Sequence, residues 1–397
     1  MVDKRVPELR FEGFDGDWEQ RKLGDLGSVA MNKRIFKDQT SDNGEVPFFK
    51  IGTFGSYPDA FISRELFEEY KSKYPYPEVG DILISASGSI GRTVVYQGED
   101  EYFQDSNIVW LKHNGRLDNK FLQQFYSIVN WQGIEGSTIK RLYNKNILDT
   151  NIRVPTLDEQ NKLGAFFEQL DDTIALHQQK LDQLKRLKQG LLQILFGNKE
   201  PVPKVRFAGF DEEWEQRKFK ELSTKQGKKN SQGLDFPAYS VSNKVGLIAQ
   251  TDQFDGSRLD DLEKTSYKFV EPKEFAYNPA RINVGSIAFN NLNKKVIVSS
   301  LYVVVKMSDD LDNEFILQYI KSPIFIKEVR RNTEGSVREY LFYENFANIK
   351  VPYTKSIEEQ RLIGMFFKQL DNTINLHQTK LEKLKQLKQA FLQSMFI

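Results

Sequence analysis

The chain of 397 residues contains no cysteine and only three histidines. Without cysteine, a disulfide framework, a thiol nucleophile and a cysteine-ligated metal are all excluded. His113 stands alone, while His177 and His377 occupy matching places in two similar segments, so their spacing predicts no metal cluster. We expect these last two histidines to be polar positions that set the register of a helix pair.

An excess of charge of either sign is also missing. The 56 basic and 55 acidic side chains leave a formal net charge of +1. A protein that holds duplex DNA alone usually carries a strong basic excess, because it must neutralise phosphates. A DNA-binding function therefore requires local basic patches, or partner subunits that supply the phosphate contacts.

The apolar runs in this chain are short. The stretch from Val296 to Val305 is interrupted by two serines and is much shorter than the ~20 residues of a membrane-spanning helix. The first residues show no apolar segment of a signal peptide. A hydrophobic content of 39% is nevertheless enough for globular cores. We expect a cytoplasmic protein with two or three domains and no membrane association.

Catalytic motifs occur only as fragments. The sequence Asn-Pro-Ala-Arg at 278–281 lacks the second proline and the aromatic residue of an amino-methyltransferase motif. Pro58-Asp59 with Glu69-Tyr70-Lys71 fits a nuclease pattern only through common residue types. The chain also lacks a phosphate-binding Gly-x-x-x-x-Gly-Lys-Ser/Thr loop. We therefore predict a non-catalytic chain that binds no cofactor or metal of its own.

What the chain does contain is an internal repeat. Segment 6–26 recurs at 202–222, with Val-Pro, Arg-Phe, Gly-Phe-Asp and Trp-Glu-Gln-Arg-Lys in the same places. A second pair of segments, 158–196 and 358–396, shares most positions, including Gln-Leu-Asp and His-Gln. The spacing is far too long for a solenoid, so the pattern indicates tandem duplication of a whole unit.

The segments enclosed by these flanks are much less alike. Residues 27–150 and 223–347 share only short fragments. We align Val79-Gly80-Asp81-Ile82 with Val284-Gly285-Ser286-Ile287, and Glu135-Gly136-Ser137 with Glu334-Gly335-Ser336. The order is therefore variable module, shared helix, variable module, shared helix.

Each shared segment is predicted to be a long amphipathic helix, because its apolar residues are three or four positions apart and it contains no proline. A helix over 158–196 is on the order of 58 Å long and cannot bury its apolar stripe inside one small domain. We expect the two helices to form an antiparallel coiled coil. Alternatives are a membrane-surface helix and a homodimer zipper. The stripes are Leu163, Phe166, Phe167, Leu170, Ile174, Leu181, Leu184, Leu187, Leu191 and Leu195, and Ile363, Phe366, Phe367, Leu370, Ile374, Leu381, Leu384, Leu387, Phe391 and Met395.

The modules are predicted to be mixed α/β, because turns rich in aspartate, glycine and proline separate short β-branched runs. The overall prediction is two similar mixed α/β domains, joined by two long helices with a pseudo-two-fold repeat. The expected boundaries are domain 1 at 1–155, the first long helix at 156–196, a linker at 197–205, domain 2 at 206–352 and the second long helix at 353–397.

Polar and basic residues on predicted turns are candidates for DNA recognition. Arginine can pair bidentately with guanine, and asparagine with adenine, in the major groove, while glycines allow close backbone approach. Singly, each such residue is more often a solvated surface group; their joint placement at corresponding turns favours recognition. The candidates are Ser87, Ser89, Arg92, Thr93, Ser137, Lys140 and Arg141 in the first module, and Asn278, Arg281, Asn290, Asn291, Ser336 and Arg338 in the second.

Taken together, these features resemble the specificity subunit of type I restriction–modification enzymes. Each module opens with Phe-x-Gly-Phe-x-x-x-Trp-Glu and closes with a proline, an acidic-Glu-Gln triplet and a Leu-rich helix. The triplets are Asp158-Glu159-Gln160 and Glu358-Glu359-Gln360. The resemblance covers essentially the whole chain. It implies two target-recognition domains, each reading one half of a split, asymmetric site in double-stranded DNA.

The resemblance also implies partners. The helix pair would set the spacing between half-sites and dock two modification subunits, which carry S-adenosylmethionine and methylate adenine. Restriction subunits would add ATP- and Mg-dependent translocation and cleavage. The base-reading residues do not carry over from the family, since they differ between modules. The alternative function is a coiled-coil scaffold with two protein-binding modules; a self-sufficient methyltransferase or nuclease is a further, less favoured one.

Overall fold

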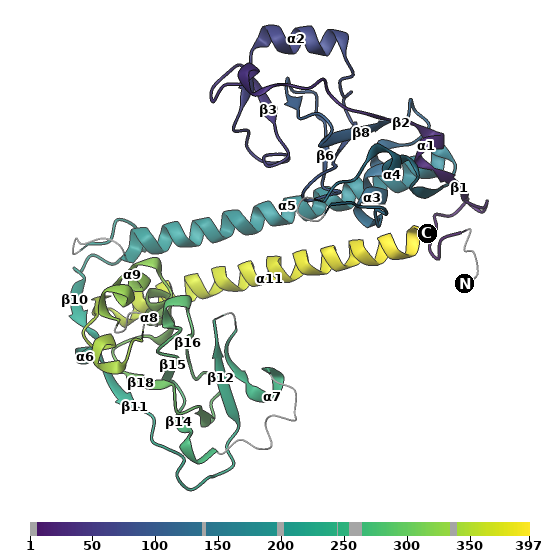
Figure 1. Ribbon diagram of the computed structural model, residues 1–397. Coiled ribbons are helices and arrows are strands. Elements are labelled where there is room, and N and C mark those ends of the chain that lie inside the picture. Colours follow the sequence, from purple (N-terminus) through teal and green to yellow (C-terminus); the bar gives the residue numbers. More distant parts are fainter. Residues whose placement is uncertain (1–5, 137–139, 197–201, 244, 254–263, 334–339) are drawn as a thin grey trace. The chain divides into compact units, whose positions relative to one another are not determined.

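The computed structural model describes residues 6–136, 140–196, 202–243, 245–253, 264–333 and 340–397. It divides into two compact units. Unit 1 comprises residues 1–178 and 380–397, and unit 2 comprises residues 179–379. Each unit contains one module together with parts of both long helices (Figure 1).

Unit 1 is built on two small sheets and a terminal strand pair. A four-stranded antiparallel sheet has the order β2-β8-β5-β6, a second sheet has the order β4-β3-β7, and β1 pairs with β9. The strands are β1 (Glu19–Lys22), β2 (Ser28–Ala30), β3 (Val46–Phe49), β4 (Phe61–Ile62), β5 (Ile82–Ser85), β6 (Thr93–Val95), β7 (Tyr102–Phe103), β8 (Ile108–Lys112) and β9 (Asn151–Val154). The helices are α1 (Leu23–Leu26), α2 (Arg64–Lys73), α3 (Asn119–Ile128) and α4 (Asn144–Leu148), with a 3₁₀ turn η1 (Lys37–Gln39).

Unit 2 repeats this plan. Its sheets have the orders β11-β18-β15-β16 and β13-β12-β17-β14, and β10 pairs with β19. The strands are β10 (Glu215–Lys218), β11 (Ser223–Gln226), β12 (Ala238–Ser242), β13 (Gly246–Ala249), β14 (Lys268–Val270), β15 (Phe275–Tyr277), β16 (Ile287–Phe289), β17 (Val296–Val298), β18 (Val303–Met307) and β19 (Lys350–Tyr353). The helices are α6 (Phe219–Leu222), α7 (Gln250–Gln253), α8 (Asn313–Ile320), α9 (Pro323–Asn332) and α10 (Tyr343–Phe346), with turns η3 (Lys264–Ser266) and η4 (Ile282–Val284). Within the described parts, β14 and α9 have no counterpart in unit 1.

The strand order corrects one alignment made from sequence. Gly285 precedes β16, and its counterpart is Gly91 before β6; the two have φ of +85° and +82°. Gly80 instead precedes β5, so the expected match of 79–82 with 284–287 is wrong. A Val-Gly-polar-Ile pattern marks any turn that enters a buried strand, and therefore it did not distinguish the two turns.

The true counterparts of residues 78–81 are residues 271–274. In each turn an acidic side chain accepts a hydrogen bond from the backbone N–H three residues earlier. The distance is 2.8 Å for Asp81 with Glu78, and 2.8 Å for Glu274 with Glu271. The two modules thus share local turn chemistry that their sequences conceal.

The two long helices are α5 (Leu157–Phe196) and α11 (Ile357–Met395). They begin where Thr156 and Ser356 accept hydrogen bonds from the N–H groups of Glu159 and Glu359, which caps the first turn. No helix in the described part of the chain is both long and apolar enough to cross a membrane.

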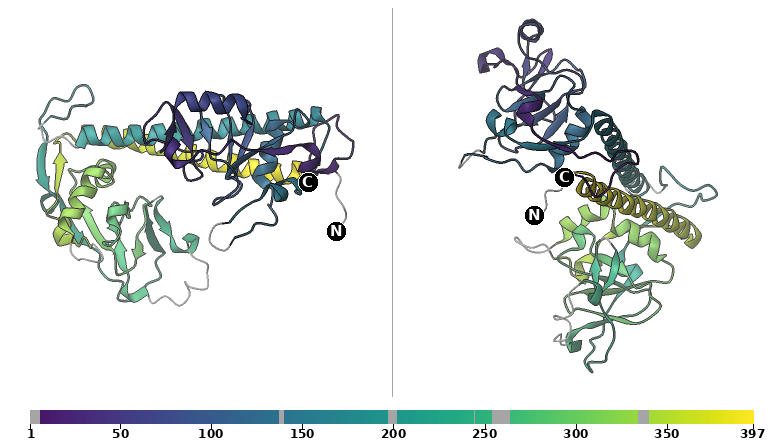
Figure 2. Two further views of the ribbon diagram at one scale, coloured as in Figure 1. Left: turned by 45° about the horizontal axis from the view of Figure 1, so that its top comes forward. Right: turned by 90° about the vertical axis from the view of Figure 1, so that its right-hand side faces the viewer.

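Within each unit, α5 and α11 run antiparallel (Figure 2). In unit 1 the rings of Phe166 and Phe391 lie 5.2 Å apart, and Lys388 Nζ is 2.6 Å from Asp171 Oδ1. In unit 2 Lys188 Nζ is 2.5 Å from Asp371 Oδ1. Residue numbers rise along one helix as those of their partners fall along the other, so the expected antiparallel pairing is confirmed.

The apolar stripe is less completely buried than expected. Leu187 and Leu387 were assigned to it, yet they are 52% and 45% exposed. A two-helix pair gives each helix a single neighbour, which covers a narrow seam. The repeat-equivalent Leu176 and Leu376 are also 65% and 69% exposed. The outer side of the pair therefore presents apolar positions that this chain leaves uncovered.

The final turn of each long helix completes the core of the module in its own unit. In unit 1, the end of α11 packs against α3 (Figure 1). The rings of Phe396 and Phe121 stack there at 5.2 Å. In unit 2, the end of α5 packs against α8, with Phe196 5.5 Å from Phe315. Each module is thus closed by the helix that follows the other module in sequence.

The acidic-Glu-Gln triplets hold each module to its long helix. Glu159 is fully buried and forms two hydrogen bonds with Arg10, at 2.6 and 2.7 Å. Glu359 does the same with Arg206, at 2.6 and 3.0 Å. The following glutamine accepts from the backbone N–H at the start of α3 or α8. The triplet that carries the family resemblance is therefore structural.

Candidate nucleic-acid interface

Most of the expected recognition residues of the first module lie at one end of the four-stranded sheet in unit 1. The loop between β5 and β6, residues 86–92, lies against segment 140–142. Leu142 N–H donates to Ala86 O at 2.8 Å, and Gly88 N–H donates to Lys140 O at 3.2 Å. Of the first-module candidates inside the described residues, this arrangement joins Ser87, Ser89, Arg92, Thr93, Lys140 and Arg141.

Several of these side chains are engaged within the protein. Ser87 is buried and donates to Asn107 Oδ1 at 2.7 Å. Arg92 donates to Ile51 O at 2.9 Å and lies over the Phe54 ring, so it secures a neighbouring turn. Thr93 is half-buried in β6. The side chains of Ser89, Lys140 and Arg141 are exposed and remain candidates for contact with DNA.

Beside this loop lies a hollow of about 350 Å³. Arg141 contributes to it, as do Tyr143 and Lys145, which the sequence interpretation did not select. Ser106, with φ of +52°, forms another part of the wall. The Tyr143 ring is 48% exposed, so the hollow combines two cations with an accessible aromatic face. Basic groups interleaved with aromatic ones suit nucleic acid.

Unit 2 has the corresponding loop between β15 and β16, residues 278–286. Leu341 N–H donates to Pro279 O at 3.1 Å, the equivalent of the Leu142–Ala86 bond. Asn278 Oδ1 accepts from Ala280 N–H at 3.0 Å and so shapes the turn, while Arg281 is exposed. The same frame therefore carries different polar side chains in the two modules.

Two expected residues lie elsewhere. Asn290 and Asn291 follow β16, at the opposite end of the sheet from the 278–286 loop, because β15 and β16 are antiparallel. Asn290 is buried, and its amide nitrogen donates to Val270 O and Lys294 O at 2.9 and 2.8 Å. Asn290 is therefore a turn-stabilising residue in this conformation, unavailable to a base. Asn291 is exposed but apart from the other candidates.

Three further candidates fall outside the described residues: Ser137, Ser336 and Arg338. They belong to the segments just before Lys140 and Tyr340.

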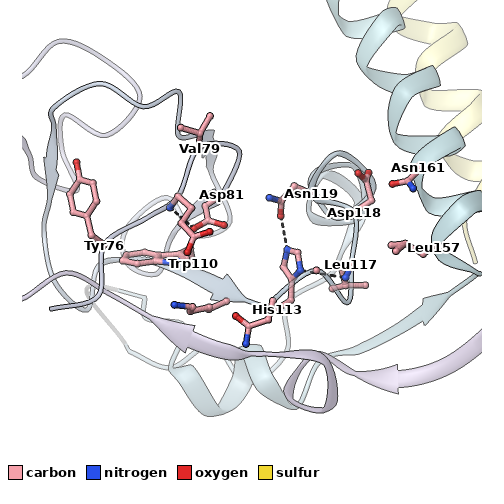
Figure 3. Close-up of a pocket in the computed structure, with 14 residues that line it drawn as sticks. Tyr76, Val79, Asp81, Trp110, His113, Leu117, Asp118, Asn119, Leu157 and Asn161 are labelled. Carbon is pink, nitrogen blue, oxygen red and sulfur yellow. Dashed lines mark hydrogen bonds between the residues drawn. The ribbon is translucent and has the colours of Figure 1, made fainter. Parts of the chain in front are cut away.

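A second hollow in unit 1, of about 400 Å³, lies at the other end of the sheet (Figure 3). His113 Nε2 is bonded to Asn119 Oδ1 at 2.7 Å, and Asp81 is bonded to the Glu78 N–H. Burial raises the pKa of the Asp81 carboxyl. The side chains of Asp81 and His113 are thus engaged in holding a turn and the start of α3. In the described regions, groups of three or more His, Asp or Glu side chains able to hold a metal ion are absent.

Comparison with known proteins decides the family. The model of the type I restriction modification DNA specificity domain matches twice, over residues 15–186 and 211–386. The chain belongs to this family. It carries two DNA specificity domains and is the specificity subunit of a type I restriction–modification system, a non-catalytic DNA-recognition chain. The two matches coincide with the two copies of the internal repeat.

Relatives carry the same description. A putative type I restriction enzyme specificity subunit of Haemophilus influenzae is 55% identical over 151 residues, which is 38% of this chain and 39% of the relative. The putative MjaX specificity subunit of Methanocaldococcus jannaschii is 22% identical over 95% of this chain and 92% of its own length. The MjaVIII specificity subunit of the same organism is 21% identical over 99% and 93%.

Solved structures agree on the fold. The S subunit of a type I restriction-modification system from M. genitalium matches with a TM-score of 0.63 at 15% identity, covering 99% of both chains. A chain from a study of complex assembly and conformational transition of the type I R-M system gives 0.51 at 15% identity, covering 96% and 98%. At this identity the likeness establishes the arrangement of elements and carries no base-reading residues across.

Proposed function

We propose that each module reads one half of a split, asymmetric site in double-stranded DNA. The supporting observation is the shared frame. Loops 86–92 and 278–286 lie at the same end of the corresponding sheet in each module, and equivalent backbone hydrogen bonds hold them there. The side chains on these loops differ. A common scaffold with exchanged polar groups is what recognition of two unrelated half-sites requires.

Within this proposal, Ser89, Lys140 and Arg141 serve the first half-site, and Asn278 and Arg281 the second. An arginine that forms two hydrogen bonds to guanine contributes on the order of 1–3 kcal/mol of discrimination. Ser137, Ser336 and Arg338 remain candidates from the sequence pattern. We retain the domain limits 1–155 and 206–352, with the two helices between and after them acting as spacers.

The helix pair is proposed to dock two modification subunits. Leu176 and Leu387 are exposed on the helices of unit 1, and Leu376 and Leu187 are exposed on those of unit 2. These sets are repeat equivalents, so the chain offers two similar apolar surfaces for two copies of one partner. The modification subunits would supply S-adenosylmethionine and methylate adenine in the cytoplasm, and restriction subunits would add ATP- and Mg-dependent cleavage.

Affinity capture of the tagged full chain from its native cell, followed by mass spectrometry, tests the partner. We expect a DNA methyltransferase, with sequence-specific DNA binding by the complex. Calorimetry with S-adenosylmethionine should show binding by the complex and none by the purified chain alone. Tight binding of S-adenosylmethionine to the isolated chain would refute its assignment to the partner.

A further inference from the structure

Three lysines of unit 2 converge at the end of β11. Gly227, with φ of +90°, turns the chain as β11 ends. The following Lys228 accepts a hydrogen bond at its carbonyl from Phe269 N–H at 2.9 Å. Lys229 forms an isolated β-bridge with Lys268, the first residue of β14. The bridge therefore places Lys229 opposite Lys268, from a distant part of the sequence, and Lys228 is its neighbour in the chain.

The charges in this cluster are poorly compensated. Lys225, on β11 itself, pairs with Glu344 at 2.8 Å on the surface. Lys228 and Lys229 are exposed, and neither pairs with a carboxylate within the described ranges. The half-buried Lys268 amine donates to the carbonyl of Tyr302 at 2.7 Å. Burial, with Lys225 and Lys229 nearby, lowers the pKa of Lys268. Bringing like charges together is unfavourable unless an anion is available to offset the repulsion.

The turn that carries Lys228 and Lys229 lies at the same end of the sheet as the proposed reading loop, residues 278–286. Gln226 at the end of β11 pairs with Val304 of β18, and the adjacent Val303 pairs with Tyr277. Tyr277 is the last residue of β15, immediately before the 278–286 loop. The turn after β11 therefore lies at the same end of this sheet as that loop, with β18 between them, while Lys268 is supplied by β14 of the second sheet.

We propose that Lys228, Lys229 and Lys268 bind the DNA phosphate backbone beside the second half-site. The inference rests on the proposed function and adds to it a residue set that anchors the duplex and carries no base specificity. Lysine suits this task, because its ammonium is a compact point charge with rotatable donors and lacks the planar fork that reads guanine.

The first module also has exposed basic residues at the corresponding place after β2, Lys33 and Arg34, but their surroundings differ. At the corresponding place after β2, Asn32 is 2% exposed, and Lys33 Nζ lies 5.0 Å from the centre of the Tyr74 ring. Strand β14, which supplies Lys268, also has no counterpart in the described part of the first module. We therefore expect the two modules to differ in how they hold the backbone, since the cations after β2 lie over the rings of Tyr74 and Phe36 and the described part of the first module has no counterpart of Lys268.

The test measures how salt affects DNA binding by the complete modification complex. The complex would contain either the wild-type chain or the double variant Lys228→Ala/Lys229→Ala, and the probe is a duplex with the cognate site. The logarithm of affinity falls linearly with the logarithm of salt, by about 0.9 per neutralised phosphate. The double variant removes two such lysines and should therefore lower the slope by about 2. It should also weaken cognate and unrelated duplexes by the same factor, with discrimination unchanged.

Lys220→Ala is the matched control, since Lys220 is an exposed lysine of the same unit on α6, before β11. It should leave the salt slope unchanged. If the wild-type complex shows no preference for any duplex, the proposed function fails, whatever the lysines do. If the wild-type complex is specific and the double variant keeps its slope, the phosphate anchor is overturned. A change in discrimination without a change in slope also overturns it and makes the lysines base readers.

Discussion

At the scale of single residues, buried ion pairs connect each repeat flank to its long helix. Glu159 and Glu359 have no exposed surface, and each carboxylate is satisfied by an arginine from the segment that opens its module. Glu359 additionally accepts from Trp214 Nε1 at 3.1 Å. Removing one member would leave the other charged and buried, which is far costlier than loss of a surface pair.

Arg206→Met should destabilise unit 2 by about 3 kcal/mol, because it leaves Glu359 buried without its cation. Denaturant unfolding of the full chain, followed by tryptophan fluorescence, measures this change. Arg331→Ala removes a surface i,i+3 pair with Glu328 and serves as the control, with an expected cost below about 0.5 kcal/mol. Equal effects of the two variants would show that the buried pair has no special role.

A pH-dependent prediction concerns Glu274. Burial raises the pKa of its carboxyl above the ordinary value of 4.5. The folded state therefore favours the protonated form, and the contribution of Glu274 to stability falls as the pH rises from about 4.5 through the raised pKa. Glu274→Gln keeps an acceptor for the Glu271 N–H without the charge.

The Gln variant should match the wild type near pH 4 and exceed it above the raised pKa, by less than about 1 kcal/mol. Unfolding curves at several pH values measure the difference. Glu274→Ala is the control and should be less stable than Glu274→Gln at every pH, since it leaves the Glu271 N–H without this acceptor. A stability advantage of the Gln variant over the wild type that shrank as the pH rose would contradict the assigned sign.

The exposure of a candidate side chain could be predicted where it follows from a local turn, and could not where it depends on tertiary contacts. Arg141 and Arg281 were selected from turn patterns, and both are exposed at the loop end of the sheet in their own module. Asn290 had the same polar character, but its amide is satisfied by backbone groups that the sequence pattern does not bring together. The Lys228–Lys229 pair was visible in the sequence, yet its significance depends on Lys268 from β14.

At the scale of elements, the long helices could be predicted because their periodicity is a local property. The packing partners of their C-terminal ends could not be predicted: in unit 1 Phe396 contacts Trp18 and Phe121, hundreds of residues away in the sequence. In unit 2, Phe196 fills the corresponding place. The two helix ends are interchangeable in principle, because the apolar residues that close the modules correspond in the repeat. They are Leu192, Leu195 and Phe196 in α5, and Leu392, Met395 and Phe396 at the end of α11.

A fragment ending at Gly197 should therefore form a homodimer. Alone it lacks the α11 turn that closes unit 1, but the α5 end of a second copy can supply it. Sedimentation equilibrium should give a dimer, and Phe196→Asp should abolish it. With modification subunits, this dimer should methylate the first half-site and its inverted copy, still interrupted by unread base pairs. A stable monomeric fragment, or a target without two-fold symmetry, would refute this model of antiparallel exchange.

At the scale of the whole molecule, the near-zero net charge matches a chain that reads bases and leaves much of the phosphate neutralisation to its partners. Charges are unevenly distributed, with a cluster of lysines beside one proposed reading loop. The duplication explains why one chain has two modules with the same sheet order. The repeated segments on either side of each module showed the duplication in the sequence. The common fold of the two modules is seen only in the order and pairing of their strands.

The central claim, that the two modules read separate half-sites, is tested most directly by sequencing methylated adenines in cells that express the chain with its modification subunits. The wild type should yield one asymmetric motif interrupted by unread bases. Arg141→Ala should relax the sequence of one half only, and Arg281→Ala that of the other half only. A continuous motif, or two variants that relax the same half, would contradict the account.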